Sequence, residues 1–186
     1  MKEIKIFGRG GQGAVMASQI LATAAFLEGY WAQTFPQYGA ERRGAPVIAY
    51  IRLDQEPIPI RSKVYSPDSV IVMDFNLFKM VNPLADLKPE GIALLNYPDS
   101  SELPEELRKM QIHFFTVDAS SIAHQIYGKT TIPITNIIIL GAYCAAQQDV
   151  SLESIQKALP DFFADDKLEL NMKAAQIGYN SIRGAK

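Results

Sequence analysis

Cysteine and histidine are scarce in this sequence. Its 186 residues include one cysteine, Cys144, and two histidines, His113 and His124, all far apart along the chain. An iron–sulfur cluster needs about four cysteine thiolates, and a structural zinc site needs about four Cys or His ligands in paired spacing. The sequence therefore excludes a cluster and predicts that the chain holds no metal.

Long apolar runs and runs of one charge are missing as well. No stretch approaches the roughly 18 uncharged apolar residues of a membrane span, and residues 1–6 are typical of a strand rather than of a signal peptide. The 18 basic and 20 acidic residues nearly balance, and no cluster of Lys and Arg stands out. We expect a cytoplasmic protein that binds neither membrane nor nucleic acid, so any anion site must be local.

Apolar periodicity predicts strands that alternate with helices over residues 1–186, as one domain with no linker. The expected strands are 4–7, 30–35, 47–53, 69–73, 91–95 and 112–117. The expected helices are 14–27, about 75–82 and 103–109, then 119–127, 135–148, 151–158 and 165–182. We expect Pro36 to end the second strand, and residues 58–64 to form an edge hairpin with 47–53. The fold class is α/β: a mostly parallel, Rossmann-like sheet with helices on both faces and an antiparallel edge hairpin.

A glycine-rich turn joins the first strand to the first helix. Residues 8–13, Gly-Arg-Gly-Gly-Gln-Gly, fit the pattern G-x-G-x-x-G, in which glycines let a phosphate approach the N-terminus of a helix. A nicotinamide site also needs an acid at the end of the second strand, about 20 residues on, but Thr34-Phe35-Pro36 stands there. The candidate binding residues are therefore Gly10, Gly11, Gln12 and Gly13, without an NAD assignment. The alternative is that the glycines only allow tight packing between helix and strand.

An arginine-rich loop follows the second strand. Residues 37–45 read Gln-Tyr-Gly-Ala-Glu-Arg-Arg-Gly-Ala. Because this loop and the glycine turn both follow strand ends, we expect them to lie close together. Arg42 and Arg43 would bind phosphate or carboxylate bidentately beside the helix N-terminus, with Tyr38 shaping the loop. A solvated loop in which Glu41 pairs locally with an arginine is the alternative.

Several further residues have both a structural and a functional interpretation. Asp74 ends a buried strand, where sites of α/β folds gather, but it also suits a helix N-cap. Thr135 and Asn136 begin an apolar helix, and we expect one to cap it and either to be a candidate ligand contact. Cys144 is expected to be an inert buried thiol. We assign no catalytic residue.

The motifs together resemble the gamma subunit, or gamma domain, of the 2-oxoacid:ferredoxin oxidoreductases, most closely the pyruvate and 2-ketoisovalerate type. The resemblance covers almost the whole chain. It is carried by residues 8–13, by Pro36-Gln37-Tyr38-Gly39-Ala40-Glu41-Arg42-Arg43-Gly44-Ala45-Pro46, by Pro59-Ile60-Arg61-Ser62 and by residues 69–74.

The resemblance implies an enzyme complex that converts a 2-oxoacid, CoA and oxidised ferredoxin to acyl-CoA, carbon dioxide and reduced ferredoxin. Thiamine diphosphate, magnesium and iron–sulfur clusters would be held by alpha, beta and ferredoxin-like delta subunits. No Gly-Asp-Gly thiamine motif occurs in this chain, which agrees with that division. This subunit would supply architecture and CoA contacts, and would be inactive alone. The alternatives are a gamma-type subunit of a 2-oxoglutarate or indolepyruvate oxidoreductase, or an independent nucleotide-binding oxidoreductase.

Overall fold

The chain folds around one seven-stranded mixed sheet with the strand order β2-β3-β1-β4-β5-β6-β7. The computed structural model describes residues 1–38 and 44–185. The strands are β1 (Lys2–Arg9), β2 (Trp31–Tyr38), β3 (Pro46–Asp54), β4 (Ser69–Val72), β5 (Ile92–Asn96), β6 (His113–Val117) and β7 (Arg183–Ala185). The four central strands β1, β4, β5 and β6 run parallel, while β3 and β7 are antiparallel to their neighbours. The predicted α/β class with a mostly parallel sheet is confirmed.

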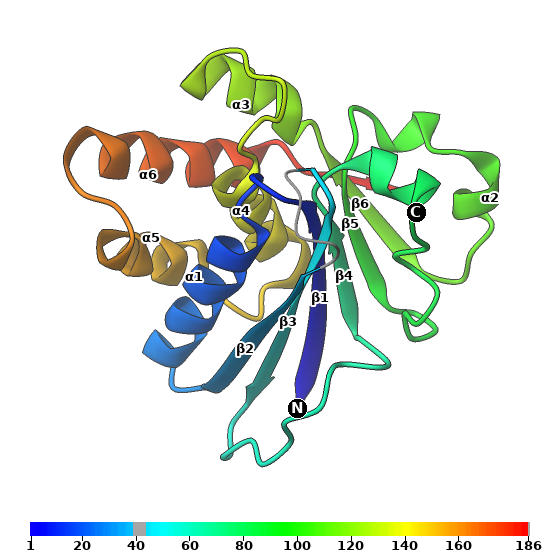
Figure 1. The fold of residues 1–186 in the computed structure, drawn as a ribbon, viewed down its shortest axis with the longest axis horizontal. Coiled ribbons are helices and arrows are strands. Elements are labelled where there is room, and N and C mark those ends of the chain that lie inside the picture. The colour runs from blue at the N-terminus through cyan, green and yellow to red at the C-terminus, as the bar shows by residue number, and fades with distance from the viewer. Residues whose placement is uncertain (39–43, 186) are drawn as a thin grey trace.

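Helices cover the two faces of this sheet unequally. The α-helices are α1 (Ala14–Leu27), α2 (Glu105–Arg108), α3 (Ala119–Tyr127), α4 (Asn136–Gln147), α5 (Leu152–Ala158) and α6 (Asp165–Asn180). The 3-10 helices are η1 (Phe75–Lys79), η2 (Ser100–Glu102) and η3 (Leu159–Asp161). Figure 1 shows α1, α4, α5 and α6 gathered on one side of the sheet and the short α2 on the other. No helix in the described ranges is long and apolar enough to cross a membrane.

Side chains of the central strands alternate between two hydrophobic cores. Ile71 of β4 and Leu94 of β5 belong to the large core under the long helices. Their neighbours Val70 and Leu95 belong to a smaller core on the opposite face. Successive side chains of a strand point to opposite faces of the sheet, which gives this alternation. Because both faces are buried, the sequences of these parallel strands are continuous apolar runs.

α4 is the central helix of the large core. Its residues from Asn136 to Cys144 are all buried, because the sheet lies on one side of the helix and α6 on the other. Glycines make the contact with α6 close. A Cβ on Gly141 would lie 1.9 Å from the Ala175 carbonyl oxygen, and one on Gly178 would lie 2.0 Å from that of Ile138. Only residues without a side chain fit at these two positions.

The edge hairpin exists, but residues 58–64 do not form it. β3 pairs with β2 on one side and with β1 on the other, so both of its edges are already occupied. Residues 55–68 run as an irregular segment instead, although Val64 is buried. The prediction of an antiparallel edge hairpin holds with β2 and β3 as its two strands, and the assignment of 58–64 was wrong.

β2 also continues through Pro36, contrary to prediction. Pro36 is paired in register with Ala49, and the strand ends only at Tyr38. A proline is tolerated because β2 is an edge strand, where an N–H turned away from the sheet has no ladder partner to lose.

Other predicted helix boundaries also differ from the observed ones. The helix expected over 75–82 is the shorter η1, and the one expected over 103–109 is reduced to α2, which begins after Pro104. The last helix stops at Asn180, and the following residues form β7, which the sequence did not predict. β7 covers the outer edge of β6.

Candidate functional site at the carboxyl edge of the sheet

The glycine turn follows β1 at the edge where the parallel strands end. Gln12 closes this turn on itself: its N–H donates to the Arg9 carbonyl at 2.9 Å, and its side-chain Oε1 accepts the Arg9 N–H at 2.8 Å. The Gln12 side chain is 1% exposed. Gln12 therefore fixes the shape of the turn, and its amide oxygen is already occupied within the protein.

Two glycines of the turn need their conformational freedom. Gly11 has φ of 101° and Gly13 has φ of 83°, values that other residues adopt only with strain. A Cβ on Gly11 would meet no atom within 4 Å, so this residue faces open space. Gly13 is the N-cap of α1, and the first turn of that helix carries no acidic side chain. The positive end of the α1 dipole thus has no acidic side chain in that turn to balance it.

The N-terminus of α4 lies against that of α1. A Cβ on Gly13 would be 2.5 Å from Nδ2 of Asn136, the first residue of α4. The Asn136 Oδ1 accepts the N–H of Ile137 at 2.9 Å. The structure therefore brings together Gly13 and Asn136, two candidate residues that are far apart in the sequence.

Thr135 occupies the N-cap position of α4, as predicted for either Thr135 or Asn136. Its carbonyl accepts the Ile139 N–H at 3.0 Å, but its side chain makes no capping bond. Thr135 is fully buried, and its Oγ1 has no hydrogen-bond partner among residues 1–38 and 44–185. Because a buried hydroxyl is usually paired, the unpaired state of this oxygen within those ranges is unusual.

The C-terminal end of the arginine loop lies beside the glycine turn, as predicted. The Gly10 N–H donates to the Ala45 carbonyl at 2.9 Å, and the Gly44 N–H donates to the Gly10 carbonyl at 3.2 Å. Arg42 and Arg43 themselves, with the rest of 39–43, lie outside the described residues. Tyr38 is described only as the last residue of β2, opposite Val47. Predictions for these three side chains remain predictions.

Arg9 is a part of the site that sequence reasoning missed. Its Nε donates to the Gly44 carbonyl at 3.1 Å, and its Nη1 pairs with Asp74 Oδ2 at 3.2 Å. Asp74 also caps η1, because its Oδ1 accepts the Asn76 N–H at 2.9 Å. The N-cap interpretation of Asp74 is thus confirmed, with an added ion pair. The signal for Arg9 was its place inside the glycine motif, where a charged side chain can reach neighbouring loops.

A second missed residue, Asn96, joins the next strands at the same edge. The Asn96 Nδ2 donates to the Met73 carbonyl at 2.8 Å and to Ser120 Oγ at 2.9 Å. It therefore ties the ends of β4 and β5 to the start of α3. This amide network links three neighbouring elements at the carboxyl edge.

Cys144 and His113 lie away from this edge. Cys144 is buried inside α4, and burial raises the pKa of its thiol to about 12. His113 is exposed at the opposite, amino end of β6, 3.3 Å from Glu90. The expected inert role of Cys144 is consistent with this environment.

The chain was compared with known proteins. Residues 3–181 match the family model described as pyruvate ferredoxin/flavodoxin oxidoreductase. The chain belongs to this family. It is 47% identical over 180 residues to the "Pyruvate/ketoisovalerate oxidoreductases common subunit gamma" of Pyrococcus furiosus, covering 96% of each chain. It is 43% identical over 183 residues to the "Pyruvate synthase subunit PorC" of Methanocaldococcus jannaschii, covering 98% of this chain and 97% of that subunit.

Solved structures agree with this family assignment. The crystal structure of the pyruvate oxidoreductase subunit PORC from Thermotoga maritima superposes with a TM-score of 0.83 at 33% identity, covering 100% of this chain and 98% of that one. The 2-oxoglutarate:ferredoxin oxidoreductase of Magnetococcus marinus is 20% identical with a TM-score of 0.79, and this chain covers 30% of it. That second likeness shows the fold alone. The predicted resemblance to gamma, or PorC-type, subunits of the pyruvate/ketoisovalerate oxidoreductases is confirmed.

Proposed function

We propose that this gamma subunit works in a cytoplasmic complex that converts a 2-oxoacid, CoA and oxidised ferredoxin to acyl-CoA, carbon dioxide and reduced ferredoxin. The complex would contain alpha, beta and ferredoxin-like delta subunits. The chain's own part is to bind CoA at the carboxyl edge of its sheet. The observation that carries this proposal is the meeting of two helix N-termini, at Gly13 and Asn136, next in sequence to the buried hydroxyl of Thr135, which has no partner within the described ranges.

The chemistry of this edge suits the phosphates of CoA. Two helix N-termini meet here, and the positive ends of their dipoles favour an anion at their junction. In the described ranges the N–H groups of Gly11 and Gly13 have no backbone acceptor. These groups and the Thr135 hydroxyl would donate to phosphate oxygens, while Gln12 holds the turn in place. Arg9 is neutralised by Asp74 and would position Gly44 rather than bind CoA.

The arginine loop would complete the CoA site. Arg42 and Arg43 directly precede Gly44, whose N–H is bonded to the glycine turn. The two arginines are therefore one and two residues from a point of the loop that is bonded to Gly10, three residues before Gly13. Two guanidinium groups would add bidentate, charge-assisted hydrogen bonds to the phosphates.

The redox cofactors fit this chain poorly, which supports their assignment to other subunits. The single cysteine is buried in α4 and holds its proton strongly, and the sequence contains no Gly-Asp-Gly. Thiamine diphosphate, magnesium and the clusters would therefore be bound by the partner chains. The name "common subunit" of the Pyrococcus furiosus relative describes a chain shared by two oxidoreductases. We infer that the choice of 2-oxoacid also rests mainly with other subunits, pyruvate and 2-ketoisovalerate being the expected substrates.

Reconstitution tests the proposed function. The chain would be produced alone and together with its neighbouring subunits, and each preparation assayed for CoA-dependent reduction of viologen by pyruvate and by 2-ketoisovalerate. The isolated chain should be colourless and inactive, and the co-purified complex active. Viologen reduction by the isolated chain, or failure of the chain to enter an active complex, would contradict the proposal.

A further inference from the structure

A cavity opens on the face of the sheet opposite α1 and α4. Its volume is about 240 Å³, and its floor is formed by Lys5 of β1 and Tyr50 of β3, which are directly paired in register. The alternation along β1 turns Ile4 and Ile6 into the large core, so Lys5 faces the other way. The cavity is thus separate from the junction of the two helix N-termini.

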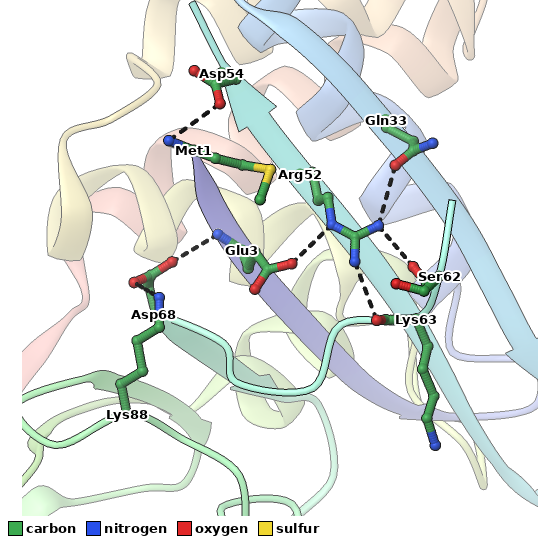
Figure 2. Close-up of polar contacts among 9 residues, drawn as sticks. All are labelled: Met1, Glu3, Gln33, Arg52, Asp54, Ser62, Lys63, Asp68 and Lys88. Atoms are coloured by element: carbon green, nitrogen blue, oxygen red, sulfur yellow. Dashed lines mark hydrogen bonds and ion pairs between the residues drawn. The ribbon is translucent and has the colours of Figure 1, made fainter. Parts of the chain in front are cut away.

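One wall of this cavity is held rigidly by a buried arginine. Arg52 of β3 is 1% exposed, and its guanidinium donates to the carbonyl oxygens of Ser62 at 2.7 Å and Lys63 at 3.1 Å. Figure 2 shows both carbonyls turned toward Arg52, while the Lys63 side chain points away from it. A further bond to Glu3 Oε1 at 2.8 Å fixes the guanidinium. The irregular segment 55–68 is therefore anchored, and it presents Lys63, Val64 and Tyr65 to the cavity.

The ammonium of Lys5 is incompletely satisfied. Its side chain is 6% exposed, and Nζ donates to Asp86 Oδ2 at 2.7 Å. A lysine ammonium carries three donors, and no other acceptor for it occurs within the described parts of the chain. Asp86 itself is 59% exposed. A nearly buried cation with donors to spare is unusual and favours an additional oxygen ligand.

The other lining groups define the chemistry of that ligand. Lys63 adds a second positive charge at the rim, where its Nζ lies 5.0 Å from the centre of the Tyr65 ring. With Asp86 as the one acid in the lining, the charges sum to a net positive cavity. The Tyr50 hydroxyl donates its proton to Gln37 Oε1 at 2.6 Å, so the ligand's hydrogen bonds would come from the lysines. The apolar walls are supplied by Phe7, Ile48, Val64 and Val81.

We propose that this cavity is a binding site for a short-chain monocarboxylate. The carboxylate would accept hydrogen bonds from Lys5 and balance Lys63, and a branched or straight chain of a few carbons would lie against the apolar walls. Asp86 would remain the first counterion of Lys5 and would limit affinity by like-charge repulsion.

Titration of the full-length chain with isobutyrate tests this site, with isobutyramide as an uncharged probe of the same shape. Amide chemical shifts in ¹H–¹⁵N spectra are followed at constant ionic strength in a buffer free of carboxylates. Isobutyrate should shift the amides of Lys5, Tyr50 and Val64 saturably, and isobutyramide should bind about tenfold more weakly or worse, because it lacks the charge-assisted contact. Equal binding of the two probes, or shifts confined to other regions, would overturn the proposal.

Variants at exposed positions keep the test independent of folding. Lys63→Met should weaken isobutyrate binding several-fold, and Asp86→Asn should strengthen it by removing the like charge. Lys109→Met is the matched control, because Lys109 is an exposed lysine paired with Glu105 on α2, and it should leave binding unchanged. If Asp86→Asn fails to tighten binding, or if Lys109→Met weakens it as much as Lys63→Met, the assigned contacts are wrong.

Discussion

Gly13 and Asn136 meet so closely that a Cβ on the glycine would lie 2.5 Å from the asparagine Nδ2. This contact joins the N-termini of α1 and α4 and sets the geometry of the candidate CoA site. It depends on the absence of a side chain at Gly13 and on the left-handed φ of that residue.

Gly13→Ala should therefore destabilise the chain more than Gly11→Ala does. Both changes impose the strain of a positive φ, about 1–2 kcal/mol, but only Gly13→Ala adds a steric conflict, worth roughly 1–3 kcal/mol more. Urea unfolding of the two variants measures the difference. The extra cost should vanish when Asn136→Gly is also introduced, and its persistence there would show that the contact is not its cause.

Arg52→Met should lower the free energy of unfolding by about 3–5 kcal/mol, because it leaves Glu3 and two backbone carbonyls without their buried donor. Arg61→Met, at an exposed position of the same segment, is the matched control and should change stability by less than about 0.5 kcal/mol. Protease cleavage within 55–68 should accelerate in Arg52→Met alone. Similar stability of the two variants would show that Arg52 does not anchor the segment.

Asp68→Asn should destabilise the chain in a pH-dependent manner. Burial opposes ionisation of Asp68, but the bonds from Lys88 and from the Glu3 N–H outweigh it and lower its pKa from 3.8. A carboxyl with a lowered folded pKa adds stability above its unfolded pKa, and that stability is lost as the pH falls through the folded value. The difference between wild type and Asp68→Asn should therefore be full at pH 7 and shrink below about pH 4. Urea midpoints measured across this range provide the comparison, and a constant difference would contradict the assigned cause.

Cys144 should resist thiol reagents in the folded chain. With its pKa raised to about 12 by burial, the thiolate fraction at pH 8 is on the order of one in ten thousand, and access is also blocked. Reaction with 5,5′-dithiobis(2-nitrobenzoate) should be undetectable in buffer and complete in urea. Rapid labelling of the folded chain would contradict the burial of this helix face.

Local signals in the sequence predicted α1 correctly from Ala14 to Leu27, since glycines bound it at both ends and Gly29 has the expected positive φ of 89°. The path of β2 through Pro36 was missed because it depends on β2 being an edge strand, which is a property of the whole sheet. Residues 58–64 have strand-like composition, but β3 has no free edge for them.

The candidate site was predictable only in part. The glycine turn and its approach to Gly44 and Ala45 followed from strand ends meeting at one edge. The sequence could not predict the inward orientation of the Gln12 side chain or the contact of Asn136 with Gly13, because both are set by tertiary packing. Arg52 was missed for the same reason: its partners include backbone carbonyls of Ser62 and Lys63, which carry no signature in the sequence.

The CoA dependence of the assembled enzyme tests the central claim most directly. In a complex reconstituted with the Arg42→Ala, Arg43→Ala double variant, the KM for CoA should rise at least about tenfold, because charge-assisted contacts to phosphate are lost, while the KM for the 2-oxoacid stays within about twofold. Arg108→Ala, an exposed arginine on α2, serves as the control and should alter neither constant. Unchanged CoA kinetics in an intact complex carrying the double variant would contradict the assignment of CoA binding to this edge of the gamma subunit.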